Sequence, residues 1–560
     1  MGTEHQEHQY WKVFALIIIG IVLTVMIVWN LRHPYSTGWD EANYINRIYE
    51  DSFAYEEGGI IGLAKALLVQ GRIRPPAHRL MMLPLSLTVG PEPRILRFCS
   101  ILFFLLTLFF FYKTVAILSG RPVGYMMAAM LAICPGFVAA AMRIYTEPPL
   151  FLGIASSFYF LVRYFSKPES QRLSLAGLSC SLALGLLAKL TFVQVVGPAM
   201  LVALITTVWG ADNKPRFRQL LIACVMGGIL VSPFYALNLG RYLGYAKYAW
   251  DFGGRSLLQP NYLSNLQLLL SYDLGPLLAV VVFIVLALAL SKRMSGKKDS
   301  TDRRRRILLV AFAAGAAPLF LTHILMPNPD PKITTAAVIP FLMVVAMLMR
   351  NEFLAHRWFS ISFAILISLQ GLILALVLNF VPNGYAKPTH EVLNLPVPKL
   401  FYQLLADSRL IFHHTLMATP QVAQWNWDKL YETVSSHCPE MPKIGYIGGG
   451  EAYGTPQIEY PWIRRNEKVS VISVWSRHTG DFNPELISKN IGNMDVLLTI
   501  PSSIGYPNQS QFNDEFYNML ANDSRFTGPQ SFRMGTGENE VVYIFFRKAA
   551  NEPQVIIRKD

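Results

Sequence analysis

The feature that most constrains this chain is a series of long, almost uncharged apolar runs. The first is FALIIIGIVLTVMIVW at 14–29, which as a helix is long enough to cross about 30 Å of hydrocarbon. Hydrocarbon offers no water to the backbone, so such runs cross as α-helices. Ten further runs lie near 97–118, 122–141, 148–165, 173–188, 190–210, 219–239, 276–291, 307–324, 333–349 and 358–380. We therefore expect a multi-pass α-helical membrane protein with about eleven transmembrane helices.

The composition supports this class. Hydrophobic residues make up 52% of the 560 residues and charged residues only 15%, which excludes an ordinary soluble enzyme. No small-residue cleavage site separates the first run from Arg32, so we interpret that run as a retained helix and not as a removed signal peptide. Two later runs meet in GLLAKLTF with almost no loop, and their combined length predicts a tight hairpin.

The orientation follows from the basic residues of the short loops. With a cytoplasmic N-terminus, the inside loops are SGRP, RYFSKPESQR, NKPRFR, SKRMSGKKDSTDRRRR and RNEFLAHR. Together with Asp212, which directly precedes NKPRFR, they hold seventeen Lys or Arg and five acidic residues. Lys and Arg are enriched in cytoplasmic loops, so this asymmetry predicts a cytoplasmic N-terminus and a C-terminus outside. It also explains much of the net charge of +13 without a nucleic-acid partner.

The chain divides into a predicted transmembrane domain, 1–380, and a predicted extracytoplasmic α/β domain, 381–560. The first outer loop spans 31–97 and contains GGIIGLAKALLVQG at 58–71, which suits a helix lying at the membrane surface. In the tail, helical segments are expected near 398–416 and 420–437. The strand-like runs KIGYIGG, KVSVISVW, MDVLLTIPS and EVVYIFFRK predict a partly parallel sheet.

Several familiar sites are excluded. The glycine cluster GYIGGGEAYG lacks the third glycine of a dinucleotide fingerprint, because Tyr453 stands there, and is better explained as a strand-ending turn. The sequence contains no Walker motif, HExxH motif or GxSxG elbow. Its five cysteines form neither a CxxC metal site nor a disulfide framework.

Polar clusters fall at the predicted outer ends of the helices. A single such cluster is ordinary, because charges cap helices and mark where hydrocarbon stops. Several clusters of mixed sign on one face favour a functional site. They are Asp40 and Glu41 in GWDE; Arg143, Tyr145 and Glu147 in RIYTEPP; Asp330 and Lys332 in MPNPDPKITT; and Arg72, Arg74, His78 and Arg79 in RIRPPAHR.

The order of these motifs resembles the GT-C superfamily of integral-membrane glycosyltransferases. The shared features are an Asp-Glu pair in a long first outer loop, a Glu followed by Pro in the next outer turn, and a basic residue before a later apolar helix. The resemblance is closest to the branch of protein O-mannosyltransferases, bacterial aminoarabinose transferases acting on lipid A, and related lipopolysaccharide sugar transferases. It covers roughly residues 10–350.

The resemblance implies transfer of a hexosyl or pentosyl group from a polyprenyl-phosphate carrier, in the outer leaflet of a bacterial inner membrane. The acceptor would be an envelope glycan, lipid A or lipopolysaccharide, or a protein. Asp40 matches the family's catalytic Asp, Glu41 its neighbour, and Glu147 the acidic residue of the second outer turn. Lys332 falls where relatives often place Arg followed by Tyr, although Ile333 follows here.

The chemistry requires a base for the acceptor hydroxyl and positive charge for the departing phosphate. Asp40 is the candidate base, and a single base predicts inversion of the anomeric centre. The candidate phosphate-binding residues are Lys332, Arg143, Arg74 and Arg79. In an alternative, Asp40 and Glu147, with Glu41, hold a divalent ion (Mg²⁺, Mn²⁺ or Zn²⁺) that serves the phosphate.

Three rival functions share part of this pattern. A transporter or lipid flippase would share the hydropathy, but it would place charges near mid-membrane, where Lys189 is the main candidate. An O-antigen ligase or polymerase would use a diphosphate-linked glycan. A membrane-anchored receptor would leave the outer carboxylates unexplained.

Overall fold

The computed structural model forms two compact units. The membrane unit comprises Met1–Asn30, Ile60–Pro84 and Ile95–Leu416, and the α/β unit comprises Leu31–Gly59, Leu85–Arg94 and Met417–Asp560. The structure describes residues 2–32, 39–70, 74–208, 214–253, 262, 265–266, 269–294, 303–325, 331–349, 357–380, 391–392, 395–396, 426–438, 440–448, 453–475, 483–501, 512–534 and 541–548. The predicted boundary near 381 and the predicted helix at 398–416 lie outside these residues.

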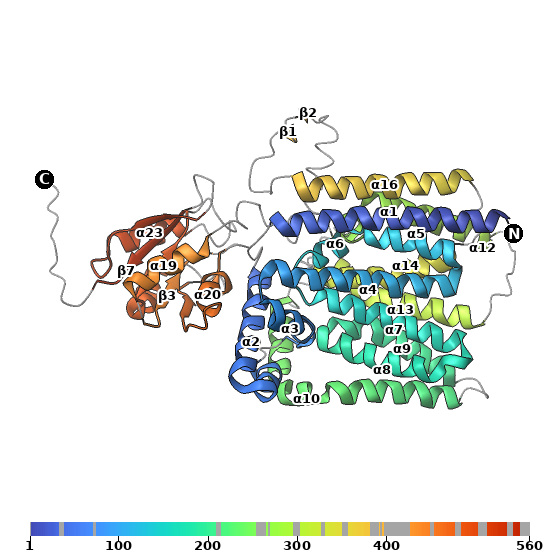
Figure 1. The fold of residues 1–560 in the computed structure, drawn as a ribbon, viewed down its shortest axis with the longest axis horizontal. Coiled ribbons are helices and arrows are strands. Elements are labelled where there is room, and N and C mark those ends of the chain that lie inside the picture. The colour runs from blue at the N-terminus through green and yellow to red at the C-terminus, as the bar shows by residue number, and fades with distance from the viewer. Residues whose placement is uncertain are drawn as a thin grey trace. The chain divides into compact units, whose positions relative to one another are not determined.

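The membrane unit is a bundle of long apolar helices that run alongside one another (Figure 1). In its described residues, each of the eleven apolar runs corresponds to a helix or to the bent pair α5 (Arg121–Ala132) and α6 (Pro135–Ala141). The other ten helices are α1 (Gly2–Arg32), α4 (Pro93–Ser119), α7 (Glu147–Ser166), α8 (Gln171–Ala188), α9 (Thr191–Val208), α10 (Lys214–Gly253), α12 (Pro276–Met294), α13 (Arg303–Leu325), α14 (Pro331–Leu348) and α16 (Arg357–Phe380).

The count of eleven crossings is not confirmed. Within the described residues, eight helices are long and apolar enough to span a membrane, or nine if the pair α5–α6, bent by 67°, counts as one span. The described apolar parts of α12 and α14 are shorter, at Leu277–Leu288 and Thr334–Leu348. The length and apolar character of these helices nevertheless make this a membrane protein.

Helix α7 lies at the centre of the bundle and is buried along most of its length. It packs closely on α8 at a glycine pair: a Cβ on Gly153 would stand 2.7 Å from the Gly185 Cα atom. Small residues let helix backbones approach one another in lipid, where hydrophobic attraction between helices is weak. Helix α8 ends at Ala188 and α9 starts at Thr191, so the two runs joined by GLLAKLTF are separate helices, as predicted.

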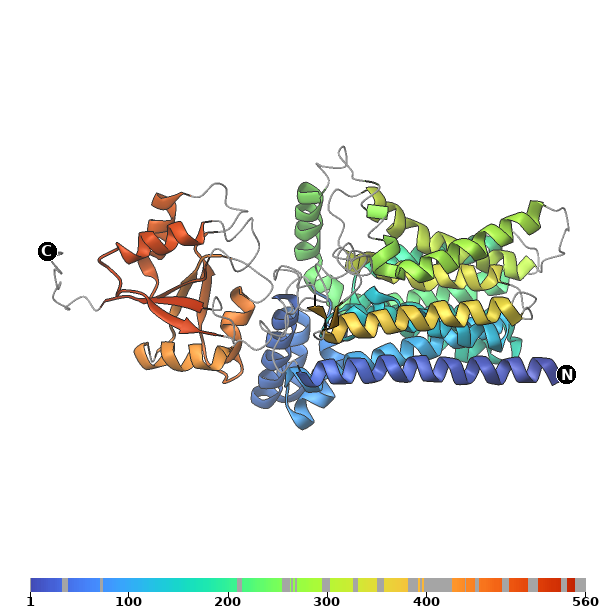
Figure 2. The same ribbon diagram turned by 90° about the horizontal axis from the view of Figure 1, so that it is seen from above.

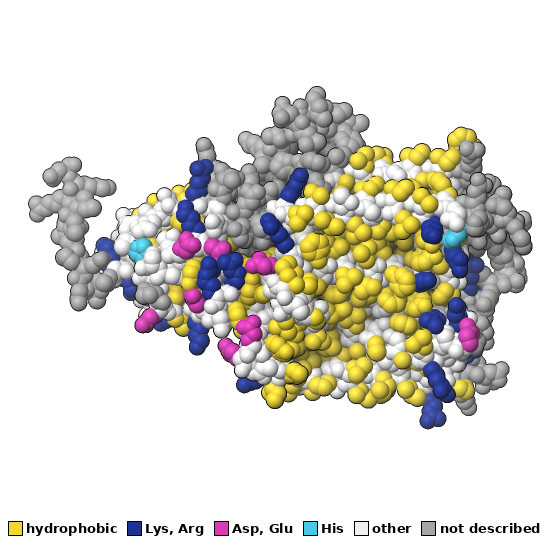
Figure 3. Space-filling view, in the orientation of Figure 1, with side chains coloured by type: hydrophobic (Ala, Val, Ile, Leu, Met, Phe, Trp, Pro, Cys, Tyr) yellow, Lys and Arg dark blue, Asp and Glu magenta, His cyan; other side chains and the backbone are white. Residues whose placement is uncertain are grey.

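The surface of the membrane unit is mostly apolar (Figure 3). Leu16, Leu102, Phe109, Leu230 and Leu237 are among its exposed side chains, which suits contact with lipid. Lys and Arg gather at the end of the bundle where the N-terminus lies, the end predicted to be cytoplasmic (Figures 1 and 3). The direction of insertion remains a prediction.

The first outer loop folds into helices. Helix α2 (Trp39–Lys65) contains a non-helical residue, Gly59, with φ 57° and ψ −147°. This conformation favours glycine, because a Cβ would be strained there. A π-helical turn, η1 (Ala66–Gln70), follows, and then helix α3 (Ala77–Val89). The predicted surface segment 58–71 is therefore largely helical, and Ile60 and Ile61 are 77% and 82% exposed.

The C-terminal part of the α/β unit contains a five-stranded sheet with the order β4-β3-β5-β7-β6. Strands β3 (Lys443–Tyr446), β4 (Ser470–Ser473) and β5 (Val496–Thr499) are parallel, whereas β7 (Val541–Phe546) runs antiparallel to β5 and to β6 (Gln530–Arg533). The prediction of a partly parallel sheet is confirmed. Strand β6 was not predicted, because its residues QSFR are mostly exposed and form no apolar run.

Helices cover both faces of this sheet (Figure 2). Side chains of α19 (Trp427–His437) and α20 (Thr455–Ile463) form one core, and those of α21 (Pro484–Asn490) and α23 (Asn513–Ala521) form another. Gly448, with φ 104°, follows β3, which supports a strand-ending turn. A two-residue pairing of β1 (Glu391–Val392) with β2 (Leu395–Pro396) precedes this domain.

Candidate active site

The turn between α6 and α7 positions the candidate residue Glu147. Thr146 stands at the N-cap position of α7 without a side-chain capping hydrogen bond, Glu147 is the first residue of the helix, and Pro148 and Pro149 complete the first turn. Proline suits this position because its fixed φ favours a helix and its missing N–H would have no helical partner there. The carboxylate of Glu147 is 3% exposed and lies at a helix N-terminus, which favours negative charge.

Glu147 forms an ion pair with Lys189. The Nζ atom of Lys189 donates to Glu147 Oε1 at 2.6 Å, and the two side chains are 27% and 4% exposed. Lys189 has an extended backbone between α8 and α9, so that its side chain leaves the ends of these helices. The close approach of Gly153 and Gly185 joins the two helices that carry the pair.

The sequence interpretation missed this partner and considered Lys189 only as a charge near mid-membrane. The structure instead places Lys189 beside the first residue of α7, at a helix boundary. The available signal was the break in GLLAKLTF, which puts Lys189 and Glu147 at corresponding ends of neighbouring predicted helices. This location weakens the transporter alternative, which required a charge within a span.

Arg143 and Tyr145 form a buried pair in the same turn. Arg143 Nη1 donates to the Tyr145 hydroxyl at 2.9 Å, and the guanidinium lies 5.8 Å from the centre of the ring. The side chains are 1% and 2% exposed. As the sequence predicted, Arg143 and Tyr145 lie in the turn before α7, and Glu147 follows directly as the first residue of that helix. Arg143 and Glu147 are thus two buried ionisable side chains in a largely apolar setting.

Arg74, His78 and Arg79 lie together at the start of α3. Burial, followed by the charges of Arg79 and Arg74, holds the pKa of His78 well below its usual range. Arg79 Nη2 also donates to the backbone oxygen of Ala66 at 3.3 Å. The three residues therefore form a basic group around a neutral imidazole.

Asp40 and Glu41 occupy the first turn of α2, where the helix dipole favours carboxylates. Asp40 is half-buried and Glu41 is fully buried. Both belong to the α/β unit, whereas Glu147, Lys189, Arg143, Arg74 and Arg79 belong to the membrane unit.

Lys332 lies in the first turn of α14, and its side chain is outside the described residues, as are Asp330 and Arg72. The nearby Thr334 and Thr335 had not been considered. Their hydroxyls donate to Asp273 Oδ2 and Oδ1 at 2.8 and 2.6 Å. Asp273 lies in the π-helical segment η5 (Leu269–Leu274) and is fully buried. No sequence pattern marked it, because it stands alone in LLLSYDLG.

Among the described residues, no group of three or more His, Cys, Asp or Glu side chains is arranged to hold a metal ion. The Oε1 atom of Glu147 already accepts the ammonium of Lys189. Metal binding by Asp40 and Glu147 stays a prediction.

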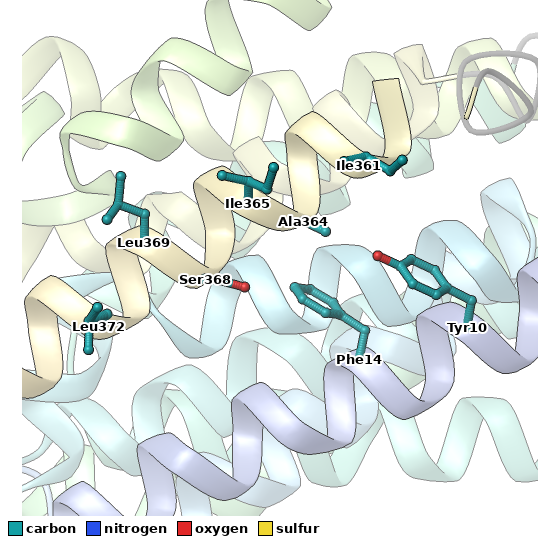
Figure 4. A pocket seen from close by; sticks show the side chains of 8 residues that line it. All are labelled: Tyr10, Phe14, Ile361, Ala364, Ile365, Ser368, Leu369 and Leu372. Atoms are coloured by element: carbon teal, nitrogen blue, oxygen red, sulfur yellow. The ribbon is translucent and has the colours of Figure 1, made fainter. Parts of the chain in front are cut away.

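A separate apolar groove lies between α1 and α16, which are side by side in both ribbon views (Figures 1, 2 and 4). Its volume is about 460 Å³. Tyr10 and Ser368 supply its polar groups, and the other lining residues are Phe14, Ile361, Ala364, Ile365, Leu369 and Leu372. The mostly apolar lining suits a hydrocarbon chain.

Comparisons with known proteins find one family model that matches part of the chain. Residues 74–236 match the family model described as dolichyl-phosphate-mannose-protein mannosyltransferase. This segment contains Arg74, Arg79, Arg143, Glu147 and Lys189, but not Asp40. No curated protein sequence matches the chain.

Several solved structures have the same fold. The apo structure of ArnT from Cupriavidus metallidurans is similar with a TM-score of 0.57 at 12% identity, over 94% of this chain and 97% of that chain. ArnT from the same organism bound to undecaprenyl phosphate gives 0.56 at 12% identity, over 96% and 99%. The apo oligosaccharyltransferase of Archaeoglobus fulgidus gives 0.50 at 11% identity, over 96% and 75%.

Proposed function

Since the chain has the GT-C fold of membrane glycosyltransferases, we propose that it is an inverting glycosyltransferase that uses a polyprenyl-phosphate sugar. One observation carries the proposal: nearly the whole chain shares its fold with nearly the whole of a protein whose structure holds undecaprenyl phosphate. The match to the mannosyltransferase family model supports the same donor class.

In the proposed reaction, the acceptor hydroxyl oxygen attacks the anomeric carbon of the sugar. The bond from that carbon to the phosphate oxygen breaks, and its electron pair leaves with the polyprenyl phosphate. Asp40 takes the hydroxyl proton as the new bond forms. A base in this role contributes a factor of about 10² to 10⁴ to the rate. Attack by the acceptor itself, opposite the leaving phosphate, inverts the anomeric centre.

Lys189 is proposed to stabilise the leaving phosphate. The phosphate gains negative charge in the transition state, so a fixed ammonium lowers the barrier. The partial exposure of Lys189 leaves it accessible, and its bond to Glu147 fixes its position. Arg143, Arg74, Arg79 and Lys332 are further candidates for the phosphate, and Arg can bind two phosphate oxygens at once.

Glu147 is proposed to hold Lys189 and not to act as the base. Its Oε1 atom already accepts the Lys189 ammonium at 2.6 Å, so the ion pair occupies an oxygen that a base would need for the proton. Glu41, fully buried next to Asp40, is proposed to shape the environment of that base. The mechanism needs no metal step, and we expect activity to survive exhaustive treatment with EDTA. Loss of activity that Mg²⁺, Mn²⁺ or Zn²⁺ restores would establish the metal alternative.

We also propose that the α/β unit faces the periplasm of a bacterium, or the cell exterior, and that the sugar is a hexose or pentose. The Lys and Arg at the N-terminal end of the bundle support this direction of insertion. The acceptor class remains an envelope glycan, lipid A or lipopolysaccharide, or a protein. Accessibility labelling of single cysteines in intact cells tests the direction.

The testing experiment measures release of free polyprenyl phosphate by the purified full-length chain in liposomes. Donors are a panel of polyprenyl-monophosphate sugars and matching diphosphate-linked sugars, with an envelope extract as the acceptor source. We expect release from at least one monophosphate donor, lowered by about 10² to 10⁴ in Asp40→Asn and retained in the control Asp514→Asn, an exposed carboxylate on α23. Release only from diphosphate donors would support a ligase or polymerase instead.

A further inference from the structure

We propose that the C-terminal α/β domain positions the helix segment that carries Asp40, through contacts between α2 and α20. Asn46, Tyr49 and Tyr460 are the positioning residues. The inference rests on the proposed function, because it gives these contacts a role in placing the base.

Helix α2 is interrupted at Gly59. At Gly59 the backbone leaves the helical conformation, and the boundary between the two compact units falls at the same residue. Residues 39–58 are therefore a helical segment that groups with the C-terminal domain and not with the transmembrane bundle. A helix of this kind moves as one body, so contacts along it set the position of Asp40.

A buried hydrogen bond connects α2 with α20. The Nδ2 atom of Asn46 donates to the backbone oxygen of Pro456, in the first turn of α20, at 2.9 Å. Asn46 is 3% exposed, and its partner Pro456 lies 410 residues later in the chain. At 1.5 Å per residue, Asn46 lies about 9 Å along the helix axis from Asp40.

An aromatic contact between α2 and α20 lies one turn further along α2. The rings of Tyr49 and Tyr460 lie 6.0 Å apart at 72°, an edge-to-face arrangement, and both side chains are buried. Burial raises the pKa of Tyr460 to about 12, and burial also raises the pKa of Tyr49. Both phenols therefore stay neutral at physiological pH, which suits a packed contact.

Ion pairs link the end of α20 to α19 of the same domain. Arg464 and Arg465, at the end of α20, donate to Asp428 Oδ1 of α19 at 2.7 and 3.1 Å. A weaker polar contact, from Asn466 Nδ2 to Glu57 Oε1 at 3.4 Å, lies near the other end of the α2 segment. The segment is thus held at several points by a domain that starts more than 350 residues later in the sequence.

These contacts assign the C-terminal domain a role in catalysis besides any role in binding an acceptor. A base must stay within hydrogen-bond reach of the proton that it removes. A displacement of about 1 Å can cost a factor of about 10² in rate. Weakening the α2–α20 contacts should therefore lower kcat and leave the KM for the lipid donor nearly unchanged.

The experiment compares Asn46→Ala and Tyr460→Ala with Tyr460→Phe, which keeps the ring. The control Asn522→Ala removes an exposed amide, just after α23, that donates to the backbone oxygen of Asn518 in the same helix. Each variant of the full-length protein is assayed for donor-dependent release of polyprenyl phosphate, and hydrogen–deuterium exchange is measured over residues 39–58. We expect both alanine variants to show a kcat at least about 10-fold lower and faster exchange in 39–58. Tyr460→Phe should show a smaller effect, because it keeps the ring and loses only the hydroxyl's hydrogen bonds to Tyr49 and Arg464. Asn522→Ala should resemble wild type.

The outcomes separate the inference from the proposed function. An active wild type whose Asn46→Ala and Tyr460→Ala variants keep their kcat would overturn the positioning role, whatever happens to the exchange. Lower kcat without faster exchange in 39–58 would also contradict it, because the helix would not have been released. A wild type that is inactive on every donor overturns the proposed function itself.

Discussion

The two regions that carry the candidate chemistry are built in different ways. Glu147 and Lys189 lie at the ends of apolar helices that pack backbone to backbone at Gly153 and Gly185, and they neutralise each other at 2.6 Å. Asp40 lies at the start of a segment that contacts the sheet-containing C-terminal domain through an amide and two phenols. The fold thus holds the cation by close packing in the bundle, and it holds the proposed base by polar and aromatic contacts with a separate domain.

This difference has a chemical consequence. A cation that serves a leaving phosphate acts at a fixed place, and rigid packing suits it. The acceptor must enter and leave, so a base attached to a distinct domain can be placed as the acceptor binds. Substitutions in the two regions should therefore have different kinetic signatures.

The largest effect is expected for Asp40→Asn. The amide keeps the shape of the carboxylate but cannot take a proton, so kcat should fall by about 10² to 10⁴, with little change in the KM for the donor. Steady-state release of polyprenyl phosphate measures both constants. A variant with more than half of the wild-type kcat would remove Asp40 from the role of base.

The next effect is expected for Lys189→Ala. Loss of one preorganised electrostatic group costs about 10² to 10³ in kcat, and Lys189→Arg should recover part of it, because the charge remains. Glu147→Gln should also lower activity. Since the two residues act as a pair, the double variant Glu147→Gln/Lys189→Ala should be less impaired than the product of the single effects. Additive effects would show that the ion pair has no joint role.

The comparison also shows what the sequence could predict. The apolar runs predicted the helices, because hydrophobic length is a local property, and four alternating runs predicted four of the five strands in the sheet. The cluster RIYTEPP was found because its residues are neighbours in sequence. Lys189 was missed as a partner of Glu147, because helix packing at a glycine pair brings together residues that lie 42 positions apart. The contact from Asn46 to Pro456 left no sequence signal at all.

A smaller effect is expected at the packing of α7 on α8. A Cβ on Gly153 would meet the Gly185 backbone at 2.7 Å, so Gly153→Val should destabilise the bundle by about 1–3 kcal/mol and lower activity through the Glu147–Lys189 pair. The control is Gly228→Val on α10, where a Cβ would meet nothing within 4 Å. Thermal unfolding in detergent measures the difference. Equal stabilities would show that the helices do not rely on this contact.

The smallest effect is a loss of stability of the α/β unit at alkaline pH. The pKa of Tyr460 is raised by burial from 10.0 to about 12, so the folded state binds its proton more tightly than the unfolded state. The resulting stabilisation is complete below pH 10 and is lost as the pH rises to about 12. Tyr460→Phe lacks this group, and its stability should fall less steeply over that window in denaturant titrations. Parallel slopes for the two proteins would contradict the burial of this phenol.

The most direct measurement of the central claim is rescue by azide, a nucleophile that needs no base. In Asp40→Ala, azide should attack the anomeric carbon, release polyprenyl phosphate and give a glycosyl azide whose anomeric configuration is inverted. In Lys189→Ala, azide should restore nothing, because the leaving phosphate still lacks its cation. Rescue of Asp40→Ala alone, with an inverted product by NMR, is the result that we predict. Rescue of both variants, of neither, or with retained configuration would contradict the division of roles between Asp40 and Lys189.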